Sequence, residues 1–330
     1  MRKTATIISL SILLLIVSFA PSSAKQKLSS LQLQGYLLSW NEGNAKDGIA
    51  SFVESVSDPS SKNFVAVEER RAFFDMDGTI LCEKPEYIEV VLTQKRLCEK
   101  AEKDSRLAAN PIYKAALEND TQYLNENAKT AIVEAFAGET LQFYLQYCKQ
   151  FLLNEWHPRF KRPYIELFYA PMIELMDYLR DHGFKVYIVS TSQQEFIRSI
   201  SKDIFIIPPE QIIGTMVAFK LRLDEKNREP TFIRQPDYFT PYNTDENKVV
   251  RIRERGLLPS IFSFGNSSGD LAMLEITAAS GLPYMACLLD HDDPQREYEY
   301  HKSKLIEIAT NRGWTIVSMK RDFKIVFRPD

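Results

Sequence analysis

Short apolar runs, each followed directly by polar residues, recur from residue 71 to the C-terminus of this 330-residue chain. They alternate with helical patterns, and alternating strands and helices form a parallel sheet with helices on both faces. Ligands of such sheets bind beyond the carboxyl ends of the strands. Polar residues follow four of the runs, at Asp75, Ser190, Gly265-Asn266 and Asp290-His291. The sequence therefore predicts an α/β fold, with a Rossmann-like parallel sheet core and a site at one edge of the sheet.

The first apolar run leads into Asp75-Met76-Asp77-Gly78-Thr79, where Gly78 permits a sharp turn. Side chains two positions apart on an extended segment point the same way, so Asp75 and Asp77 can address one point in space. Two carboxylates this close repel each other unless a cation, a proton or an electrophile lies between them. An acidic turn contains the same residues, so the pair gains chemical meaning only from the rest of the chain.

The composition is that of an ordinary soluble globular protein, with 45% hydrophobic and 26% charged residues. The net charge of -3 gives no support for nucleic acid as a partner, because nucleic-acid binding needs a basic patch. Small molecules are therefore the expected partners, and the sequence leaves the oligomeric state open.

The N-terminus has the parts of a secretory signal peptide. Met1-Arg2-Lys3 is followed by an apolar run over residues 7–20 and by small residues at Ser22 and Ala24. The run is shorter than the roughly 20 apolar residues of a membrane-spanning helix, and no Cys near the junction could carry a lipid. A signal peptide over residues 1–24 is predicted, with no stable membrane anchor, and the mature protein is expected to be exported, either periplasmic or secreted.

Residues 83–164 are expected to form a helical cap that is inserted directly after the first strand. Apolar residues recur there at spacings of three and four, which is typical of helices. The predicted helices are Tyr87 to Lys103, Pro111 to Leu117, Thr130 to Phe136 and Glu139 to Leu153. The α/β core is then expected over residues 25–82 and 165–330, and it includes a β-hairpin from Gly214 to Phe239.

Four cysteines, Cys82, Cys98, Cys148 and Cys287, would meet an oxidising compartment in an exported protein. Four cysteines allow three complete pairings, and the sequence does not choose among them. None forms a CxxC motif, so neither a zinc site nor a thiol redox motif is indicated. Cys82 and Cys287 follow apolar runs and are equally consistent with buried free thiols.

Four segments resemble, in order and context, the four motifs of the haloacid dehalogenase-like (HAD) hydrolase superfamily. They are Asp75-Met76-Asp77-Gly78-Thr79, Val189-Ser190, Lys248 and Gly265-Asn266-Ser267-Ser268-Gly269-Asp270. The chain looks closest to the phosphoserine-phosphatase-like branch and, within it, to an exported bacterial subgroup that shares segments such as Leu289 to Tyr298. The resemblance implies a Mg²⁺-dependent hydrolase of a small organic phosphomonoester that works through an aspartyl-phosphate.

The resemblance also implies roles for individual residues. Asp75 would be the nucleophile and Asp77 the general acid and base. Ser190 and Lys248 would bind the transferring phosphoryl group. Lys220 and Lys226 are competing candidates for the lysine, and Lys248 is favoured because it lies shortly before the third core strand.

Mg²⁺ is expected at Asp75, Asp77, Asp270 and Asn266, with the main-chain carbonyl of Asp77 as the contact of that residue. Many relatives carry an aspartate where this chain has Asn266. An amide is a neutral ligand, so Asp270 is expected to be the stronger ligand of the two, and the metal affinity is the property left open.

Candidates for substrate binding lie in the turn after the first strand and in the cap: Glu83, Tyr87, His157 and Arg159. An aromatic run from Phe143 to Trp156 could hold a quaternary ammonium by cation-π contacts, which makes a phosphocholine-type phosphatase one alternative. A non-catalytic ligand-binding protein of the same fold is another, suggested by Asn266. Phosphoryl transfer to another acceptor is a third. Asp77 argues against dehalogenase chemistry, which does not need it.

Overall fold

The computed structural model describes residues 35–226 and 228–328 of the chain. Its contacts divide the chain into two compact units, Met1–Gly35 and Tyr36–Asp330. The predicted signal peptide lies outside the described residues, and all the helices and strands below belong to the second unit.

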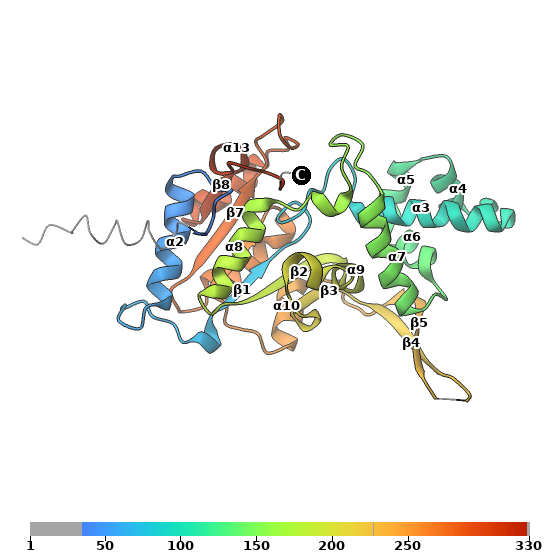
Figure 1. The fold of residues 1–330 in the computed structure, drawn as a ribbon, viewed down its shortest axis with the longest axis horizontal. Helices are drawn as coiled ribbons and strands as arrows, with labels where there is room; N and C mark the ends of the chain where they lie inside the picture. Colours follow the sequence, from blue (N-terminus) through green and yellow to red (C-terminus); the bar gives the residue numbers. More distant parts are fainter. Residues whose placement is uncertain (1–34, 227, 329–330) are drawn as a thin grey trace, which may run out of the picture. The chain divides into compact units, whose positions relative to one another are not determined.

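A six-stranded parallel sheet forms the core of the second unit, with the strand order β3-β2-β1-β6-β7-β8 (Figure 1). Its strands are short and almost entirely buried, and every neighbouring pair is parallel. Their bounds are β1 Arg71–Phe74, β2 Lys185–Gln193, β3 Ile212–Thr215, β6 Phe262–Gly265, β7 Met285–Asp290 and β8 Thr315–Ser318. The predicted α/β fold with a Rossmann-like parallel sheet is confirmed.

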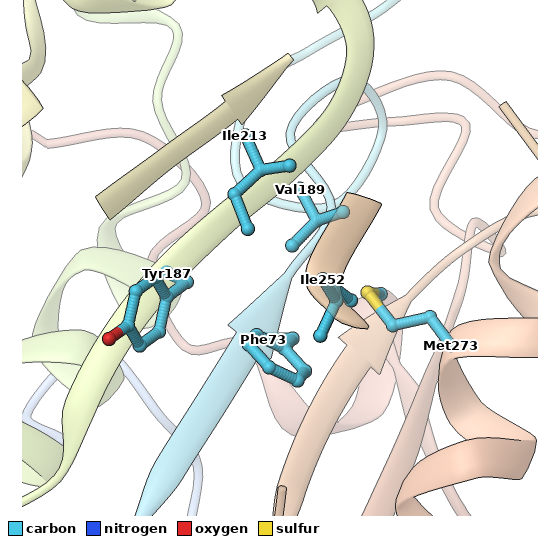
Figure 2. Packing of buried hydrophobic residues seen from close by; sticks show 6 residues of the cluster. All are labelled: Phe73, Tyr187, Val189, Ile213, Ile252 and Met273. Atoms are coloured by element: carbon cyan, nitrogen blue, oxygen red, sulfur yellow. The ribbon is translucent and has the colours of Figure 1, made fainter. Parts of the chain in front are cut away.

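Helices cover both faces of this sheet because alternate side chains of each strand point to opposite faces. Phe73 of β1 joins a buried cluster with Ile252 of α10 and Met273 of α11 (Figure 2). Its neighbour Phe74 contacts Phe262 on the other face, and Phe262 contacts a phenylalanine of α2. The helices of the core are α2 Asn44–Ser57, α8 Ala170–Asp181, α9 Gln194–Arg198, α10 Glu246–Glu254, α11 Leu271–Ala278, α12 Ser303–Asn311 and α13 Met319–Asp322.

Five further helices follow β1 and pack mainly on one another (Figure 1). They are α3 Ile88–Lys103, α4 Pro111–Leu117, α5 Thr121–Glu126, α6 Ala128–Phe136 and α7 Leu141–Asn154. Local signals set their starts: Asn110 Oδ1 accepts a hydrogen bond from Ile112 N at 2.9 Å, with Pro111 at the first helical position. The sequence predicted α3, α4, α6 and α7. It missed α5, whose one buried side chain, Leu124, gives no apolar periodicity.

A two-stranded antiparallel sheet, β4 Val217–Leu223 with β5 Pro230–Tyr238, confirms the predicted hairpin. The predicted division of the chain put this hairpin in the α/β core. Its backbone contacts are instead with the helical segment: Gly138 N donates to Arg234 O at 2.9 Å, and Arg234 N donates to Glu139 O at 2.9 Å. Hairpin patterns are local, whereas the surface on which a hairpin packs depends on contacts distant in sequence.

All four cysteines are free thiols, with Cys82, Cys148 and Cys287 buried. Burial raises the pKa of each of these three thiols above its ordinary value, so they are protonated and unreactive. In the part of the chain that the structure describes, no helix is both long and apolar enough to cross a membrane.

Candidate active site

The carboxyl ends of β1, β2 and β6 bring Asp75, Ser190 and Asn266 to one edge of the parallel sheet. Asp75 N donates to Phe264 O at 3.0 Å, which extends the pairing of β1 with β6 and fixes Asp75 at that edge. Ser190 lies inside β2, because this strand continues to Gln193. Lys248, another of the four predicted catalytic residues, reaches this edge from α10.

Lys248 binds two carboxylates at once. Its Nζ lies 2.7 Å from Asp75 Oδ1 and 2.7 Å from Asp270 Oδ1, and all three residues are buried. Burial alone would lower the pKa of Lys248, but the charges of Asp270 and Asp75 outweigh it and raise that pKa, so the ammonium stays charged. Burial and the charge of Asp270 raise the pKa of Asp75, and Lys248 opposes this shift. Lys220 and Lys226 are exposed and take no part in this site.

Asp77 has hydroxyl groups as partners. Its Oδ2 accepts hydrogen bonds from Ser190 Oγ at 3.2 Å and from Ser192 Oγ at 2.7 Å. Desolvation by burial raises the pKa of Asp77 to about 6, and the two hydroxyl groups limit the rise. A carboxyl group with this pKa can both give and take a proton near neutral pH.

Ser192 is a site residue that the sequence analysis missed. It follows Ser190 by two positions on an extended strand, so both side chains point toward Asp77. That spacing was a usable signal, because polar residues at alternate positions near a strand tip share one side.

Gly78 is required by the space around the turn after β1. Its φ is +75°, and a Cβ atom there would lie 2.0 Å from Asn266 Nδ2 and 2.7 Å from Glu83 Cδ. A residue with a side chain would therefore displace both neighbours as well as strain the backbone. Asn266 Nδ2 donates to Glu83 Oε1 at 3.3 Å, which leaves the amide oxygen of Asn266 directed elsewhere.

Oxygen atoms suited to Mg²⁺ lie on either side of the Thr79 hydroxyl. Thr79 Oγ1 is 3.4 Å from Asp75 Oδ2 and 3.3 Å from Asn266 Oδ1. Carboxylate, amide and main-chain carbonyl oxygens are the protein ligands that Mg²⁺ accepts. These two oxygens and the carbonyl of Asp77 therefore form a donor set that fits Mg²⁺.

Asp270 directs both of its oxygens to other groups. Oδ1 binds Lys248, and Oδ2 accepts from Asn266 N at 3.0 Å, Ser267 N at 2.9 Å and Ser267 Oγ at 2.9 Å. Asp270, expected from sequence to be the stronger metal ligand, thus has both oxygens engaged with protein groups. The described residues contain no group of three or more His, Cys, Asp and Glu side chains that could hold a metal ion.

Glu83 and Tyr87 line a cavity of about 480 Å³ next to this turn. Glu83 is 5% exposed and Tyr87 is 47% exposed, so only the second presents a large surface to solvent. Burial and the nearby charges of Glu83, Asp77 and Asp75 raise the pKa of Tyr87. Val90 of α3, Asn125 of α5 and Ala128 of α6 complete the wall.

The side chains of His157 and Arg159 are engaged with main-chain groups and do not line this cavity. His157 is 1% exposed, with Nε2 2.7 Å from Lys84 O and with Nδ1 accepting from Arg159 N at 3.1 Å. It therefore supports the turn that carries Glu83. Arg159 Nη2 donates to Pro294 O at 2.7 Å. These contacts give no support to the expectation that the two residues bind the leaving group, since His157 is buried with both ring nitrogens engaged and Arg159 Nη2 is held by main-chain carbonyls.

The aromatic run of α7 faces cations of the chain itself. The Arg234 guanidinium lies 3.7 Å from the centre of the Tyr144 ring, and the Arg96 guanidinium lies 5.0 Å from Phe143 and 5.7 Å from Tyr147. This face cannot also receive a quaternary ammonium ligand.

A buried polar group where α3 meets β2 was also missed from sequence. The Glu89 carboxylate accepts from Gln193 N at 3.2 Å, and Gln193 Oε1 accepts from Arg234 Nη2 at 2.6 Å. Burial raises the pKa of Glu89 to about 8. No sequence signal was available, because a glutamate at a helix start usually faces solvent.

The model of one protein family, described as haloacid dehalogenase-like hydrolase, matches residues 72–275. No curated protein matches the chain. A solved structure of a conserved functionally unknown protein from Anaerococcus prevotii is 14% identical, with a TM-score of 0.53 over 82% of this chain and 91% of that chain. A protein of unknown function from Bordetella pertussis is 17% identical, with a TM-score of 0.48 over 76% of this chain and 98% of that chain. A phosphoserine phosphohydrolase-like protein from Francisella tularensis is 15% identical, with a TM-score of 0.42 over 77% and 95%. The family match covers more than half of the sequence, and the chain belongs to the haloacid dehalogenase-like hydrolase family.

Proposed function

We propose that the protein is a Mg²⁺-dependent phosphatase that hydrolyses a small organic phosphomonoester through an aspartyl-phosphate on Asp75. The observation that carries the proposal is the different environment of two carboxyl groups on one turn. Asp75 is bound to a buried cation, whereas Asp77 is held by two hydroxyl groups and has a pKa near neutrality. This division suits a nucleophile and a general acid and base.

In the first step the Asp75 carboxylate attacks phosphorus. The bond from phosphorus to the leaving alcohol breaks as Asp77 gives its proton to the alcohol oxygen. Lys248 offsets the negative charge gathered between Asp75 and the phosphoryl group. In the second step Asp77 takes a proton from water, the water oxygen attacks phosphorus, and phosphate leaves with Asp75 regenerated.

Mg²⁺, when bound by Asp75, the main-chain carbonyl of Asp77 and Asn266, supplies positive charge to the phosphate oxygens. Asp270 holds Lys248 and the backbone of the Asn266 loop in place. Thr79 links the two side-chain ligands through its hydroxyl group.

The helical segment over residues 83–164 is proposed as the cap over this site, since three of its helices line the cavity beside Glu83. Glu83, Glu86 and Lys84 are the charged residues that line that cavity, with Tyr87 as an aromatic face. Two carboxylates against one ammonium leave an excess of negative charge, which favours a leaving group that carries a positive charge, so a phosphocholine-type phosphatase is the second candidate.

The test is phosphate release from a panel of phosphomonoesters, including para-nitrophenyl phosphate, phosphoserine and phosphocholine, with and without Mg²⁺. Wild-type protein should release phosphate, and Asp75→Asn should lose this activity while it keeps its melting temperature, because an amide does not attack phosphorus. Full turnover by Asp75→Asn would contradict the nucleophile assignment. Binding of phosphate esters without turnover by the wild type would support a non-catalytic binding protein. Phosphorylated alcohols formed when an alcohol is added would indicate phosphoryl transfer.

Export is proposed on the N-terminal sequence alone. Cell fractionation with N-terminal sequencing of the mature chain tests it, and a start after Ala24 is the expected result.

A further inference from the structure

A buried histidine contacts the catalytic turn and has no role in the proposed reaction. His291 follows β7 directly and is 2% exposed. Its Nε2 lies 2.7 Å from Gly78 O, and its Nδ1 lies 3.2 Å from Glu297 Oε2. A main-chain carbonyl only accepts hydrogen bonds, so Nε2 is the donor in the contact with Gly78 O.

We propose that His291 is a positioning residue: its ring, held by Glu297, donates a hydrogen bond from Nε2 to Gly78 O and so fixes the turn that carries Gly78 and Thr79. The inference rests on the proposed function for its kinetic consequences. Its structural part, the hydrogen bond from Nε2 to Gly78 O, stands independently of the reaction.

Glu297 is bound on every side and stays a carboxylate. It is 0% exposed, and its Oε1 accepts from Cys82 Sγ at 3.0 Å and from Tyr169 OH at 3.0 Å. Burial opposes its ionisation, but the hydrogen bond and charge of His291 outweigh burial and lower the pKa of Glu297. These hydrogen bonds hold the Glu297 carboxylate in place, so that it orients the His291 ring.

Tyr300 is the other polar group against the ring. It stacks on His291 with 4.1 Å between ring centres, and its hydroxyl oxygen lies 2.9 Å from Nε2. Burial and the charge of Glu83 raise the pKa of Tyr300, so its hydroxyl keeps its proton. If Nε2 instead accepted a hydrogen bond from the Tyr300 hydroxyl, Nε2 would carry no proton. The unprotonated nitrogen would then face the Gly78 oxygen at 2.7 Å, and two acceptors at this distance repel each other. The neighbouring Asp290 is paired with His301 Nδ1 at 2.9 Å and does not compete for His291.

The consequence for the site follows from the planarity of peptide bonds. Gly78 N donates to Leu81 O at 2.8 Å, which fixes the peptide that carries the carbonyl of Asp77. His291 fixes the next peptide through Gly78 O and so orients Thr79, whose hydroxyl touches Asp75 and Asn266. Without His291 the buried Gly78 O loses its donor, and this peptide is held only from its other side, where Thr79 N donates to Met76 O at 3.1 Å. Thr79, and with it Asp75 and Asn266, is then held less firmly.

The protonation of the ring is tested by NMR on protein with ¹⁵N-labelled histidine, with the His291 signals assigned by their absence in His291→Gln. Wild-type protein should show a proton on Nε2, the nitrogen that faces Gly78 O. A wild-type ring without a proton on Nε2 overturns the proposal. This measurement does not depend on activity, so it separates failure of this inference from failure of the proposed function.

The positioning role is tested by Mg²⁺ affinity from calorimetry and by kcat and KM for para-nitrophenyl phosphate. His291→Leu should weaken Mg²⁺ binding and lower kcat, each by about 10- to 100-fold, the usual effect of removing a residue that supports a metal ligand. KM should change little. His291→Gln should recover part of both, because an amide N–H can donate to Gly78 O.

His301→Gln is the matched control, because His301 is the neighbouring histidine but is paired with Asp290 outside the turn. It should leave both quantities unchanged. If His291→Leu lowers only the melting temperature and keeps wild-type Mg²⁺ affinity, His291 is merely structural and the proposal fails. If the leucine variant does not fold, His291→Gln and Glu297→Gln decide by the same comparison.

Discussion

The two oxygens of each catalytic carboxyl group have different partners, and at the residue scale this difference assigns the roles. Asp75 Oδ1 is bound to Lys248, whereas Oδ2 has only a long contact of 3.4 Å with Thr79. One oxygen is therefore neutralised and the other is open to an electrophile. The open oxygen also faces the side on which Asn266 presents its amide oxygen.

Lys248→Met should lower kcat by about 10²- to 10³-fold, the usual effect of removing one fixed group that stabilises transition-state charge. It also leaves the Asp75 and Asp270 carboxylates close together in a buried site without their shared cation. Steady-state kinetics with para-nitrophenyl phosphate checks the first effect, and thermal unfolding checks the second. Lys220→Met removes an exposed lysine and is the control. Equal losses in the two variants would contradict the assignment of Lys248.

Ser192→Ala should move the alkaline limb of the kcat/KM profile to higher pH. The Ser192 hydroxyl stabilises the ionised form of Asp77 and so lowers its pKa; without this hydrogen bond the pKa rises. Asp77 must be protonated to assist the leaving group, so activity should persist to higher pH in the variant. Thr191→Ala, on the same strand with its hydroxyl bound to Asn243 O, should leave the limb in place. A limb that does not move, or that moves to lower pH, would argue that Asp77 is not the acid.

Residues at strand ends could be predicted from the sequence, and residues fixed by distant contacts could not. Asp75, Asp77 and Ser190 were found because parallel strands bring their carboxyl ends to one edge of the sheet. Lys248 was chosen from three lysines only by its place before a strand. Glu89 and His291 depend on burial by elements far away in sequence, and their surroundings carry no local signal. The partner of His157, Lys84 O, likewise belongs to a different loop, so the contact carries no local signal.

At the scale of elements, local sequence signals predicted where helices and strands begin and end better than they predicted what these elements pack against. The Asn110-Pro111 signal marks the start of α4, and Gly183, with φ +79°, follows α8. Hairpin β4–β5 was predicted, but its docking on α6 and α7 was not, because Arg234 meets Tyr144 across a large sequence separation. The helices and strands could therefore be predicted from the sequence more completely than the contacts between them.

In wild-type protein, Glu89 should lower the free energy of unfolding as the pH rises, and Glu89→Gln should remove this pH dependence. Burial raises the pKa of Glu89 from 4.5 to about 8, so the folded state binds its proton more tightly than the unfolded chain does. The contribution of this group is fully present below about pH 4.5 and is lost as pH rises toward 8. The variant should match wild type near pH 5 and exceed its free energy of unfolding by a few kcal/mol at pH 8.

Urea unfolding at the two pH values measures this difference. Glu102→Gln, at an exposed position of the same helix, is the control and should follow wild type at both. A variant less stable than wild type at pH 8 would mean that the ionised carboxylate of Glu89 is itself stabilising, through Gln193 or Arg234.

For the whole molecule, the relevant fact is that negative charge is concentrated at one edge of the sheet. The net charge of the chain is only -3, yet Asp75, Asp77, Glu83 and Asp270 gather around Lys248. Such a cluster destabilises the folded state until a cation joins it, and that cation binds the folded state alone. Catalysis and folding stability should therefore depend on the same ion.

EDTA treatment should abolish phosphate release and lower the melting temperature, and added Mg²⁺ should restore both. At a free Mg²⁺ concentration one hundred times its dissociation constant, binding adds about 2.7 kcal/mol to the free energy of unfolding, which raises Tm by a few degrees. Titration of Mg²⁺ into chelator-treated protein, followed by calorimetry and by phosphate release, gives two midpoints that should coincide. In Asp75→Asn, which lacks one carboxylate ligand, the Tm response should shift to higher Mg²⁺ although no activity remains. Activity that persists in EDTA would point instead to metal-independent chemistry at Asp75, because Lys248 would then be the cation that suffices.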